Sequence, residues 1–505
     1  MTCQNKLRMV IIVIMIKKIE IKTGYNLDEY RLLTTLKSSV DELEKKAANC
    51  ANLKKKTIWM VNSTATGGGV AEMLPRMISI LRQLGFQVEW LVISPDNKDF
   101  FQLTKKIHNN LHGSGNPGFS DSDRNLMDQI GREMAGAFEK SVKPDDILVI
   151  HDPQPLPAGY FFLQKNSTVQ AVWRCHIGID KQNEASVSAW QFLKPYLQGF
   201  QQTIFSAQEY APDFLKSFTQ VIYPAIDPLT HKNRPLTIHK TTGILANAGL
   251  LPGNLRIITP QFEHKARVLK PDGNFSVMDD SENGNLLYQP LLTQISRWDR
   301  LKGFQALMKA FVELKSKSRT AQDTRHQKRL ELVKLVLAGP DPAFIADDPE
   351  GLQVLEELKS EYLKLPKEVQ KDLYLVLLPM NSAKENALIV NCLQRISTIV
   401  IQNSIREGFG LTATEAMWKS VPVLVSGAFG LTKQVRDQVE GRIHNNAEDY
   451  IGLSKVLDEM LFDARGREIY AYNGLSRVVD QFLVFKQLTH WLDVLGSDGF
   501  VRNKN

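Results

Sequence analysis

The chain has 505 residues, of which 43% are hydrophobic and 23% are charged, a composition typical of globular proteins and a length too great for one ordinary core. The formal net charge of +7 comes from 62 basic and 55 acidic side chains. Because this excess is small for the length, the composition carries no nucleic-acid-binding signature, although it suits a cleft for an anionic small molecule.

The N-terminal region predicts no membrane span. The apolar run Met9–Ile16 is far shorter than the roughly 20 residues that a helix needs to cross a bilayer. No small-residue cleavage site follows it, and its β-branched residues favour an edge strand or an N-terminal extension. The four cysteines are scattered, as expected of reduced, buried thiols. We therefore expect a cytoplasmic protein.

The first half of the chain begins with an amphipathic helix predicted at 30–47 and then alternates apolar runs with helical segments. Continuous apolar runs that are bounded by turns and separated by helices indicate a parallel sheet covered on both faces. Strands are predicted at 58–61, 88–93, 147–150, 169–175 and 203–206, and helices at 71–84, 125–139 and 185–198.

The same pattern restarts in the second half, which predicts an α/β protein with two Rossmann-like domains, 1–235 and 236–477. The Gly-, Pro- and Asn-rich segment 235–285 is expected to contain the boundary. A final helical pattern within 478–505 is expected to pack back on the first domain. Strands are predicted at 291–295, 333–338, 374–378, 398–401 and 421–425, and helices at 304–315, 351–363, 383–394 and 411–419.

A run of three glycines, Gly67, Gly68 and Gly69, follows the first predicted strand and opens a helix. Glycines let the backbone approach a ligand closely, and the free N–H groups of a helix N-terminus attract anions. The spacing matches neither the dinucleotide fingerprint nor the Walker loop. The run therefore predicts either an anion-binding turn or an ordinary flexible connection.

The strongest local motif is Arg406-Glu407-Gly408-Phe409-Gly410-Leu411, with Glu415 four residues into the helix that follows. One carboxylate in the turn and another on the helix can accept hydrogen bonds from sugar hydroxyls, while loop N–H groups face a phosphate. The alternative is that both glutamates only complement the helix dipole.

Cations follow a neighbouring strand in the same predicted domain. Arg297 and Lys302 come directly after the strand 291–295, and Gly339 ends the next strand along the chain. Open α/β sheets bind ligands at the carboxyl ends of their strands. Although surface ion pairs remain an alternative for the two cations, the combination with Glu407 and Glu415 predicts a nucleotide-sugar pocket.

These stretches resemble those of the GT-B-fold retaining glycosyltransferases, a fold of two Rossmann-like domains facing across a cleft. Within that group the chain is similar to the trehalose synthases that use nucleotide-diphosphate glucose and to the retaining trehalose phosphorylases. The stretches that carry the resemblance are 61–72, His151-Asp152-Pro153-Gln154-Pro155, Trp173-Arg174-Cys175-His176-Ile177, 226–229, 294–302, 347–351, Gln394-Arg395 and 406–415.

The resemblance implies a role for each matching residue. The catalytic set would be Arg297 and Lys302 on the donor diphosphate, Glu407 on the transferred glucose and His151 touching that glucose. Glu415 would bind the ribose hydroxyls. The remaining donor-binding positions would be Gly67, Gly68, Gly69, Gly339, Gly408, Phe409, Gly410 and Leu411, and the acceptor side would be Asp152, Arg174 and His176.

The implied activity is a retaining glucosyl transfer that makes trehalose from nucleotide-diphosphate glucose and glucose, with no cofactor and no metal. Asp121-Ser122-Asp123 matches a metal-binding Asp-x-Asp string, but its place at a helix start favours capping. The alternatives are a trehalose phosphorylase, a glucosyltransferase with another acceptor and a non-catalytic nucleotide-sugar-binding protein. We expect small-molecule partners only, neither nucleic acid nor membrane, and leave a homodimer open.

The chain also departs from the family pattern after the strand predicted at 421–425. Ala428-Phe429-Gly430-Leu431 stands there in place of the usual Gly-Gly-Ile. The departure leaves the acceptor and the nucleotide base undetermined.

Overall fold

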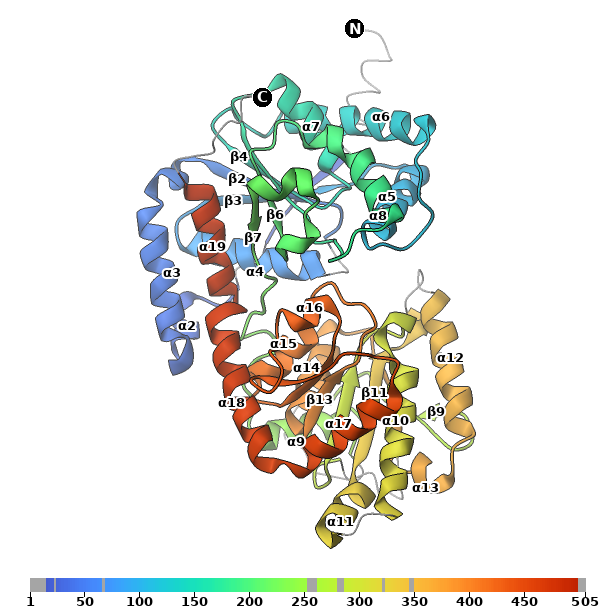
Figure 1. Cartoon of the computed structure of the whole chain (residues 1–505). Coiled ribbons are helices and arrows are strands. Elements are labelled where there is room, and N and C mark those ends of the chain that lie inside the picture. The colour runs from blue at the N-terminus through green and yellow to red at the C-terminus, as the bar shows by residue number, and fades with distance from the viewer. Residues whose placement is uncertain are drawn as a thin grey trace. The chain divides into compact units, whose positions relative to one another are not determined.

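A computed structural model of the chain describes residues 15–21, 24–65, 69–251, 261–278, 286–319, 323–344 and 349–497. The chain forms two compact units (Figure 1). Unit 1 comprises Met1–Ala225 together with Gln481–Asn505, and unit 2 comprises Ile226–Asp480. Each unit holds a mainly parallel sheet flanked by helices, so the predicted α/β class with two Rossmann-like domains is confirmed.

Unit 1 contains a seven-stranded sheet in the order β1-β3-β2-β4-β5-β6-β7. Only β1, at the edge, runs antiparallel to its neighbour. The strand predictions from the apolar runs are all confirmed, whereas the run Met9–Ile16 lies mostly outside the described residues. The strands are β1 (Ile16–Ile19), β2 (Thr57–Asn62), β3 (Gln87–Ile93), β4 (Ile147–His151), β5 (Gln170–Arg174), β6 (Gln202–Phe205) and β7 (Thr219–Val221).

The helices of unit 1 include several that the sequence did not predict. The predicted helix 30–47 is two helices, α2 and α3, joined by a short 3-10 turn, and the helices α5 and α7 were missed. The helices are α2 (Leu27–Arg31), α3 (Lys37–Asn49), α4 (Gly69–Gln83), α5 (Lys98–Leu111), α6 (Asp121–Phe138), α7 (Leu156–Lys165), α8 (Glu184–Leu193) and α19 (Val484–Gly496).

Unit 2 contains an eight-stranded sheet in the order β15-β14-β13-β10-β11-β12-β8-β9. The strands from β15 to β12 are parallel, and β8 and β9 add an antiparallel edge. The strands are β8 (Arg267–Leu269), β9 (Phe275–Ser276), β10 (Leu291–Ile295), β11 (Lys334–Pro340), β12 (Leu373–Leu378), β13 (Ile399–Gln402), β14 (Val423–Ser426) and β15 (Gly441–His444).

The helices of unit 2 bury apolar faces such as Leu307, Phe311 and Leu314 of α10 in a core with the strands. The four helices predicted in this domain are present. The structure also contains α9, α11, α13, α16 and α17, which were not predicted from the sequence. The helices are α9 (Ile238–Asn247), α10 (Phe304–Ser316), α11 (Thr324–Leu332), α12 (Pro349–Leu363), α13 (Lys367–Gln370), α14 (Ala383–Ile396), α15 (Leu411–Trp418), α16 (Phe429–Thr432), α17 (Tyr450–Phe462) and α18 (Ala464–Gln481).

Unit 2 begins at Ile226, earlier than the boundary expected within 235–285. The residues before 235 belong to unit 2 because α14 and α15 hold their backbone. Asn391 Nδ2 donates to the carbonyl of His231 over 3.0 Å, and Trp418 Nε1 donates to the carbonyl of Asn233 over 3.0 Å. Lys419 Nζ lies 3.1 Å from Asn233 Oδ1. A composition shift in the sequence does not register such side-chain-to-backbone bonds.

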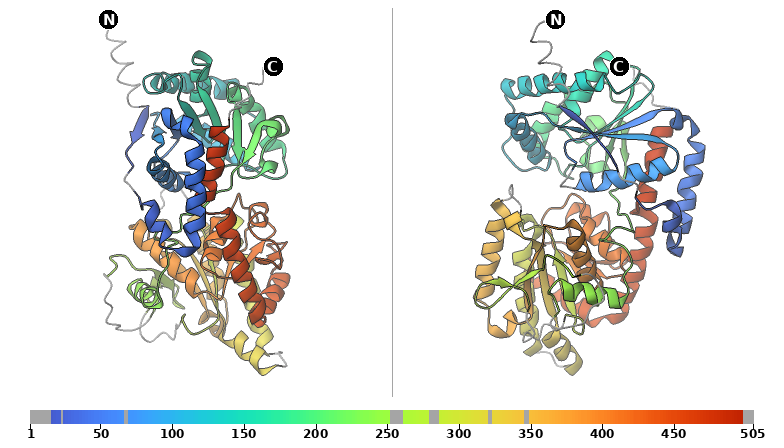
Figure 2. Two further views of the ribbon diagram at one scale, coloured as in Figure 1. Left: turned by 90° about the vertical axis from the view of Figure 1, so that its left-hand side faces the viewer. Right: turned by 180° about the vertical axis from the view of Figure 1, so that it is seen from behind.

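The C-terminal helical pattern, expected as one helix from 478, is interrupted. α18 ends at Gln481 and α19 begins at Val484, because Leu483 is extended, with φ of −90° and ψ of 151°. α19 lies along α3 within unit 1 (Figure 2), where Lys486 Nζ pairs with Glu42 Oε1 at 3.2 Å. Phe485 meets Tyr30 edge to face, with ring centroids 5.0 Å apart.

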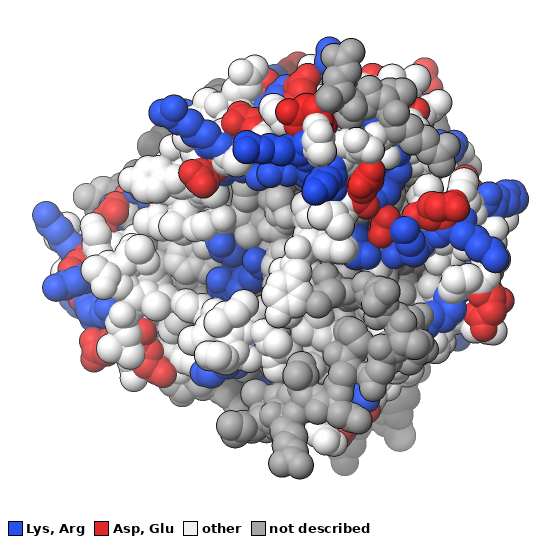
Figure 3. Space-filling view, turned by 90° about the horizontal axis from the view of Figure 1, so that it is seen from below, with Lys and Arg blue, Asp and Glu red and all other residues white. Residues whose placement is uncertain are grey.

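On the face shown in Figure 3, lysine and arginine side chains are interspersed with aspartates and glutamates. In the described part of the chain, no helix combines the length and the apolar character that a bilayer span requires. The described cysteines, Cys50, Cys175 and Cys392, are free and buried.

Candidate active site

Each sheet has one point where successive crossover connections change direction, and in open α/β sheets ligands bind there. In unit 2 the chain proceeds from β10 to β11 and β12 on one side, and from β13 to β14 and β15 on the other. The switch point therefore lies between β10 and β13, which are parallel neighbours. The loops that follow these two strands contain Arg297, Lys302, Glu407, Gly408, Phe409 and Gly410.

Lys302 and Glu407 meet at this switch point. Lys302 Nζ lies 2.6 Å from Glu407 Oε2, although 105 residues separate the two in the chain. The side chains are only 15% and 14% exposed, so the pair is desolvated more than a surface ion pair. Ser404 Oγ donates to the same carboxylate oxygen over 3.0 Å. The arrangement presents a cation and a carboxylate side by side.

Arg297 lies in the same β10–α10 loop and is far more exposed. Its guanidinium is 3.8 Å from Asp299 Oδ2, and its side chain is 68% exposed. A weak contact of this kind leaves the guanidinium available to an anionic ligand. Gly339 supports this loop from β11, because a Cβ there would stand 2.7 Å from Ser296 O and 2.5 Å from the Trp298 ring.

The loop from Gly408 to Gly410 leads into α15, which begins at Leu411 as expected. Gly410 has a φ of +85°, a conformation that favours glycine. Phe409 is 7% exposed and anchors the loop in the core. Gly430, within the segment that departs from the family pattern, packs on this loop, and its N–H donates to Glu407 O over 3.2 Å. The departure therefore retains the glycine on which the close approach depends.

Glu415 lies on α15, facing α14 and the start of unit 2. Gln394 Nε2 is 3.4 Å from Glu415 Oε2, and Lys232 Nζ is 3.7 Å from Glu415 Oε1. The side chain is 10% exposed. These long contacts leave hydrogen-bonding capacity on the carboxylate, which has about four lone-pair sites.

The switch point of unit 1 lies between β2 and β4. His151 ends β4 and His176 follows β5, and His151 Nδ1 is 3.1 Å from His176 Nε2 with the rings stacked. Asp152 Oδ1 accepts the backbone N–H of His176 over 2.7 Å. Asp152 has a φ of +65°, a strained conformation for an aspartate of the kind found at functional sites.

Burial keeps the ring pair of unit 1 uncharged. Desolvation, together with the Arg174 charge, lowers the pKa of His151 to about 3, and the same causes with His151 lower the pKa of His176 well below its usual range. Burial raises the pKa of Asp152 to about 6, although the His176 N–H and Arg174 partly offset it. At neutral pH this cluster therefore presents neutral imidazoles and an ionised carboxylate.

Arg174, expected on the acceptor side, is 1% exposed. Its Nη2 donates to Ser206 Oγ over 3.0 Å and to Ile222 O over 2.9 Å, which ties the ends of β5, β6 and β7 together. Burial lowers its pKa to about 10. Its charge therefore reaches the histidines through space, while its own bonds go to the scaffold.

The remaining predicted positions are the glycine run and the Asp-x-Asp string. Gly67 and Gly68 fall outside the described residues, and Gly69 is the first residue of α4. Asp123 forms a capping box with Ser120 at the start of α6, so the Asp-x-Asp string caps a helix. Within the described ranges, no group of three or more His, Cys, Asp or Glu side chains is placed to hold a metal ion.

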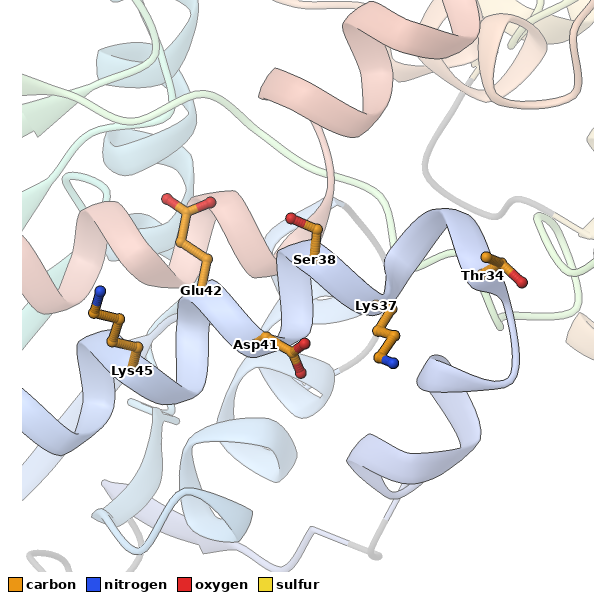
Figure 4. A pocket seen from close by; sticks show the side chains of 6 residues that line it. All are labelled: Thr34, Lys37, Ser38, Asp41, Glu42 and Lys45. Carbon is orange, nitrogen blue, oxygen red and sulfur yellow. The ribbon is translucent and has the colours of Figure 1, made fainter.

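The surface hollow in Figure 4 contains none of the predicted site residues. It lies in unit 1 and is lined by polar side chains of α3 and the turn before it: Thr34, Lys37, Ser38, Asp41, Glu42 and Lys45.

Sequence reasoning missed the polar residues that support the Lys302–Glu407 pair. Gln294 lies within β10, Gln402 ends β13, and Ser404 follows it; all three are buried. A signal was present, because a glutamine inside a strand buried on both faces needs a partner.

Family models match both units. The model described as trehalose synthase, N-terminal domain, matches residues 60–212, and the glycosyl transferases group 1 model matches residues 279–477. Among solved structures, an alpha,alpha-trehalose-phosphate synthase (UDP-forming) from Burkholderia vietnamiensis has a TM-score of 0.61 at 12% identity and covers 88% of this chain and 99% of its own. That likeness confirms the fold.

Curated relatives cover nearly the whole chain. The trehalose synthase of Thermococcus litoralis is 30% identical over 94% of this chain and 97% of its own length. A trehalose phosphorylase of Pleurotus sajor-caju is 24% identical over 84% of this chain and 55% of its own length. With both units matched and a relative aligned almost end to end, the chain belongs to the trehalose synthase family of glycosyltransferases.

Proposed function

We propose that this glycosyltransferase moves glucose from a nucleoside-diphosphate glucose to free glucose with retention of configuration, forming trehalose without a metal ion. The observation that carries the proposal is the Lys302–Glu407 pair, 2.6 Å apart at the switch point of unit 2. A cation and a carboxylate side by side suit a ligand that joins a phosphate to a sugar.

The reaction breaks the bond between the anomeric carbon and the β-phosphate oxygen, and forms a bond from that carbon to the acceptor hydroxyl oxygen on the same face. Negative charge develops on the departing phosphate, where Lys302 and the exposed Arg297 supply fixed positive charge. The acceptor proton passes to the leaving phosphate. Glu407 accepts hydrogen bonds from the hydroxyls of the transferred glucose.

Unit 1 would supply the acceptor side. His176 is neutral at pH 7 and partly exposed, so its ring can offer a hydrogen bond to a sugar hydroxyl without a charge to desolvate. His151 is 0% exposed, and its two ring nitrogens contact His176 Nε2 and Met60 Sδ, so it would act on the sugar through His176 and not by touching it. Asp152 holds the backbone of His176, and the contact with His151 Nδ1 holds its ring.

A trehalose phosphorylase is the second candidate, since a relative of that name matches most of this chain. In that reaction inorganic phosphate would occupy the place of the leaving diphosphate, beside the same cations. A product assay separates the two candidates.

The decisive experiment incubates the purified protein with UDP-, ADP- or GDP-glucose plus glucose, and separately with trehalose plus either phosphate or a nucleoside diphosphate. Trehalose formation from a nucleotide sugar, and its reversal only by nucleoside diphosphate, is the expected result. Glucose 1-phosphate from trehalose and phosphate alone would establish the phosphorylase instead. Absence of both reactions would refute transfer and favour a binding protein.

A further inference from the structure

The loops after β10 and β13 are joined by polar side chains that are almost completely buried. Gln294 and Ser404 are 0% exposed, Asn403 is 1% exposed and Gln402 is 2% exposed. Apolar residues would fill the same space without needing partners, so a buried polar group carries a cost unless its hydrogen bonds are complete. The partners of these four side chains show what they connect.

Gln294 links the end of β13 to the backbone of the loop after β10, which contains Lys302. Its Oε1 accepts the N–H of Asn403 over 2.9 Å, and its Nε2 donates to Lys302 O over 2.7 Å. Asn403 Nδ2 donates to Gly303 O over 3.2 Å. These bonds fix the two loops relative to each other.

Gln402 forms a second link between the two loops, and one of its partners, Ser404, contacts Glu407. Its Nε2 lies 3.0 Å from Ser296 Oγ and 2.9 Å from Ser404 Oγ. It therefore joins the residue before Arg297 to the loop after β13, which contains Glu407. A serine hydroxyl has one proton. Because Ser404 Oγ accepts from Gln402, its own proton is directed to Glu407 Oε2, 3.0 Å away.

We propose that Ser404 and Gln402 are positioning residues, which hold the Glu407 carboxylate in the orientation that receives the transferred sugar. This inference rests on the proposed function. Lys302 is the other partner of Glu407 Oε2. A donor phosphate competes for Lys302, and Ser404 then remains as the fixed partner that keeps Glu407 in place.

The consequence is a division between sugar-dependent and nucleotide-dependent effects. Loss of the Ser404 hydroxyl leaves Arg297 and Lys302, and hence the phosphate contacts, unchanged. It frees Glu407 to rotate, which weakens contact with the glucose part of the donor. The affinity for nucleoside diphosphate should therefore stay constant while turnover falls.

The test compares Ser404→Ala with Ser397→Ala. Ser397 precedes β13, and its buried hydroxyl donates to Leu393 O over 2.6 Å and lies 2.7 Å from the hydroxyl oxygen of Thr293, away from the carboxyl ends of the strands. We expect Ser404→Ala to lower kcat about 10-fold with less than a 2-fold change in nucleoside-diphosphate Kd. Ser397→Ala should change neither by more than 2-fold, although its thermal midpoint falls comparably.

A second variant keeps the test decisive if Ser404→Ala folds poorly. Gln402→Met retains an unbranched side chain and should lower kcat similarly, and the double variant should be no worse than either single one. Unchanged turnover in both variants, or an equal loss in Ser397→Ala, would overturn the proposal. Calorimetry of nucleoside-diphosphate glucose against nucleoside diphosphate measures the glucose-dependent affinity without turnover. Wild-type protein that binds glucose-dependently but transfers nothing would refute only the proposed function, whereas Ser404→Ala with unaltered glucose-dependent affinity would refute the positioning role.

Discussion

The switch points of the two units have the same topology but different electrostatics. In unit 1 the strand ends present His151 and His176, which burial keeps neutral. In unit 2 they present Lys302 and Glu407 as an ion pair with partial access to solvent. The same topology thus places neutral imidazoles beside the buried Asp152 in one unit and a partly accessible ion pair in the other, which suits a sugar in the first case and a charged donor in the second.

The largest expected effect is on the charged switch point. Lys302→Met should lower turnover about 10²–10³-fold, because it removes a preorganised cation and leaves Glu407 without its closest partner. Arg300→Met is the matched control: this arginine lies in the same turn and pairs with Glu357 at the surface. Steady-state rates with nucleotide-sugar donor measure both. Near-normal turnover in Lys302→Met would remove the phosphate role from unit 2.

A smaller effect is expected at Glu415. Glu415→Gln should weaken nucleoside-diphosphate binding by roughly 1.5–3 kcal/mol, because a charge-assisted acceptor for the ribose is lost. Glucose 1-phosphate has no ribose, so its affinity should stay the same. Calorimetry with both ligands gives the answer. Equal weakening would show that Glu415 only supports the contacts to Gln394 and Lys232.

The histidine pair of unit 1 should respond differently to mutation. His176→Ala should lower kcat/KM for glucose about 10-fold, in line with loss of one positioned polar contact, and leave nucleoside-diphosphate affinity unchanged. Initial rates at varied glucose, beside calorimetry, distinguish the two quantities. Lost nucleotide affinity with intact acceptor kinetics would reverse the roles of the two units.

The pH dependence of stability tests the claim that the buried histidines of unit 1 are neutral. The lowered pKa of His151 gives stability that is present above pH 6.5 and lost as pH falls towards about 3. The raised pKa of Asp152 gives stability that is present below pH 3.8 and lost as pH rises through about 6. Between about pH 4 and 6 the two slopes oppose each other.

Asp152→Asn should remove the opposing contribution, so that the pH dependence of the unfolding free energy reflects the histidines alone. Urea denaturation from pH 7 to pH 4 should show a steeper loss of unfolding free energy in this variant than in the wild type, by up to about 1.4 kcal/mol per pH unit for the one proton. Parallel curves for the two proteins would mean that Asp152 is not perturbed by its surroundings.

The smallest expected effect is that of metal removal. EDTA should leave turnover unchanged, since the charged groups of unit 2 already supply the positive charge. Activity lost on chelation and restored by manganese would contradict this expectation and favour metal binding at Asp121 and Asp123.

The sequence predicted the strands of the two sheets better than the contacts between side chains that are distant in the chain. Runs such as Leu291–Ile295 are apolar throughout, so periodicity and length locate them directly. The charged residues at strand ends were found because the carboxyl edge of an open sheet is a known place for ligands. Neither argument specifies a pairing across 105 residues such as that of Lys302 with Glu407.

Other features depend on tertiary contacts that have no local signature. The break at Leu483 lies inside a continuous helical pattern, and it allows α19 to pack on α3. The resemblance implies an acceptor-side role for Arg174, and the sequence does not indicate its hydrogen bonds to Ser206 and Ile222. The start of unit 2 is fixed by bonds from α14 and α15 that composition does not reveal.

The bond from Lys419 to Asn233, at the start of unit 2, makes this lysine a chemical reporter. Burial lowers its pKa to about 7, although the Glu415 carboxylate partly opposes the shift, so a large fraction of the amine is unprotonated at neutral pH. Exposed lysines are mostly protonated there, but reagents can reach them. Lys419 is 8% exposed and bonded to Asn233, so an acylating reagent gains access only when the chain around Asn233 detaches. The acylation rate of this one residue, followed by mass spectrometry, would therefore measure local opening of unit 2 under native conditions.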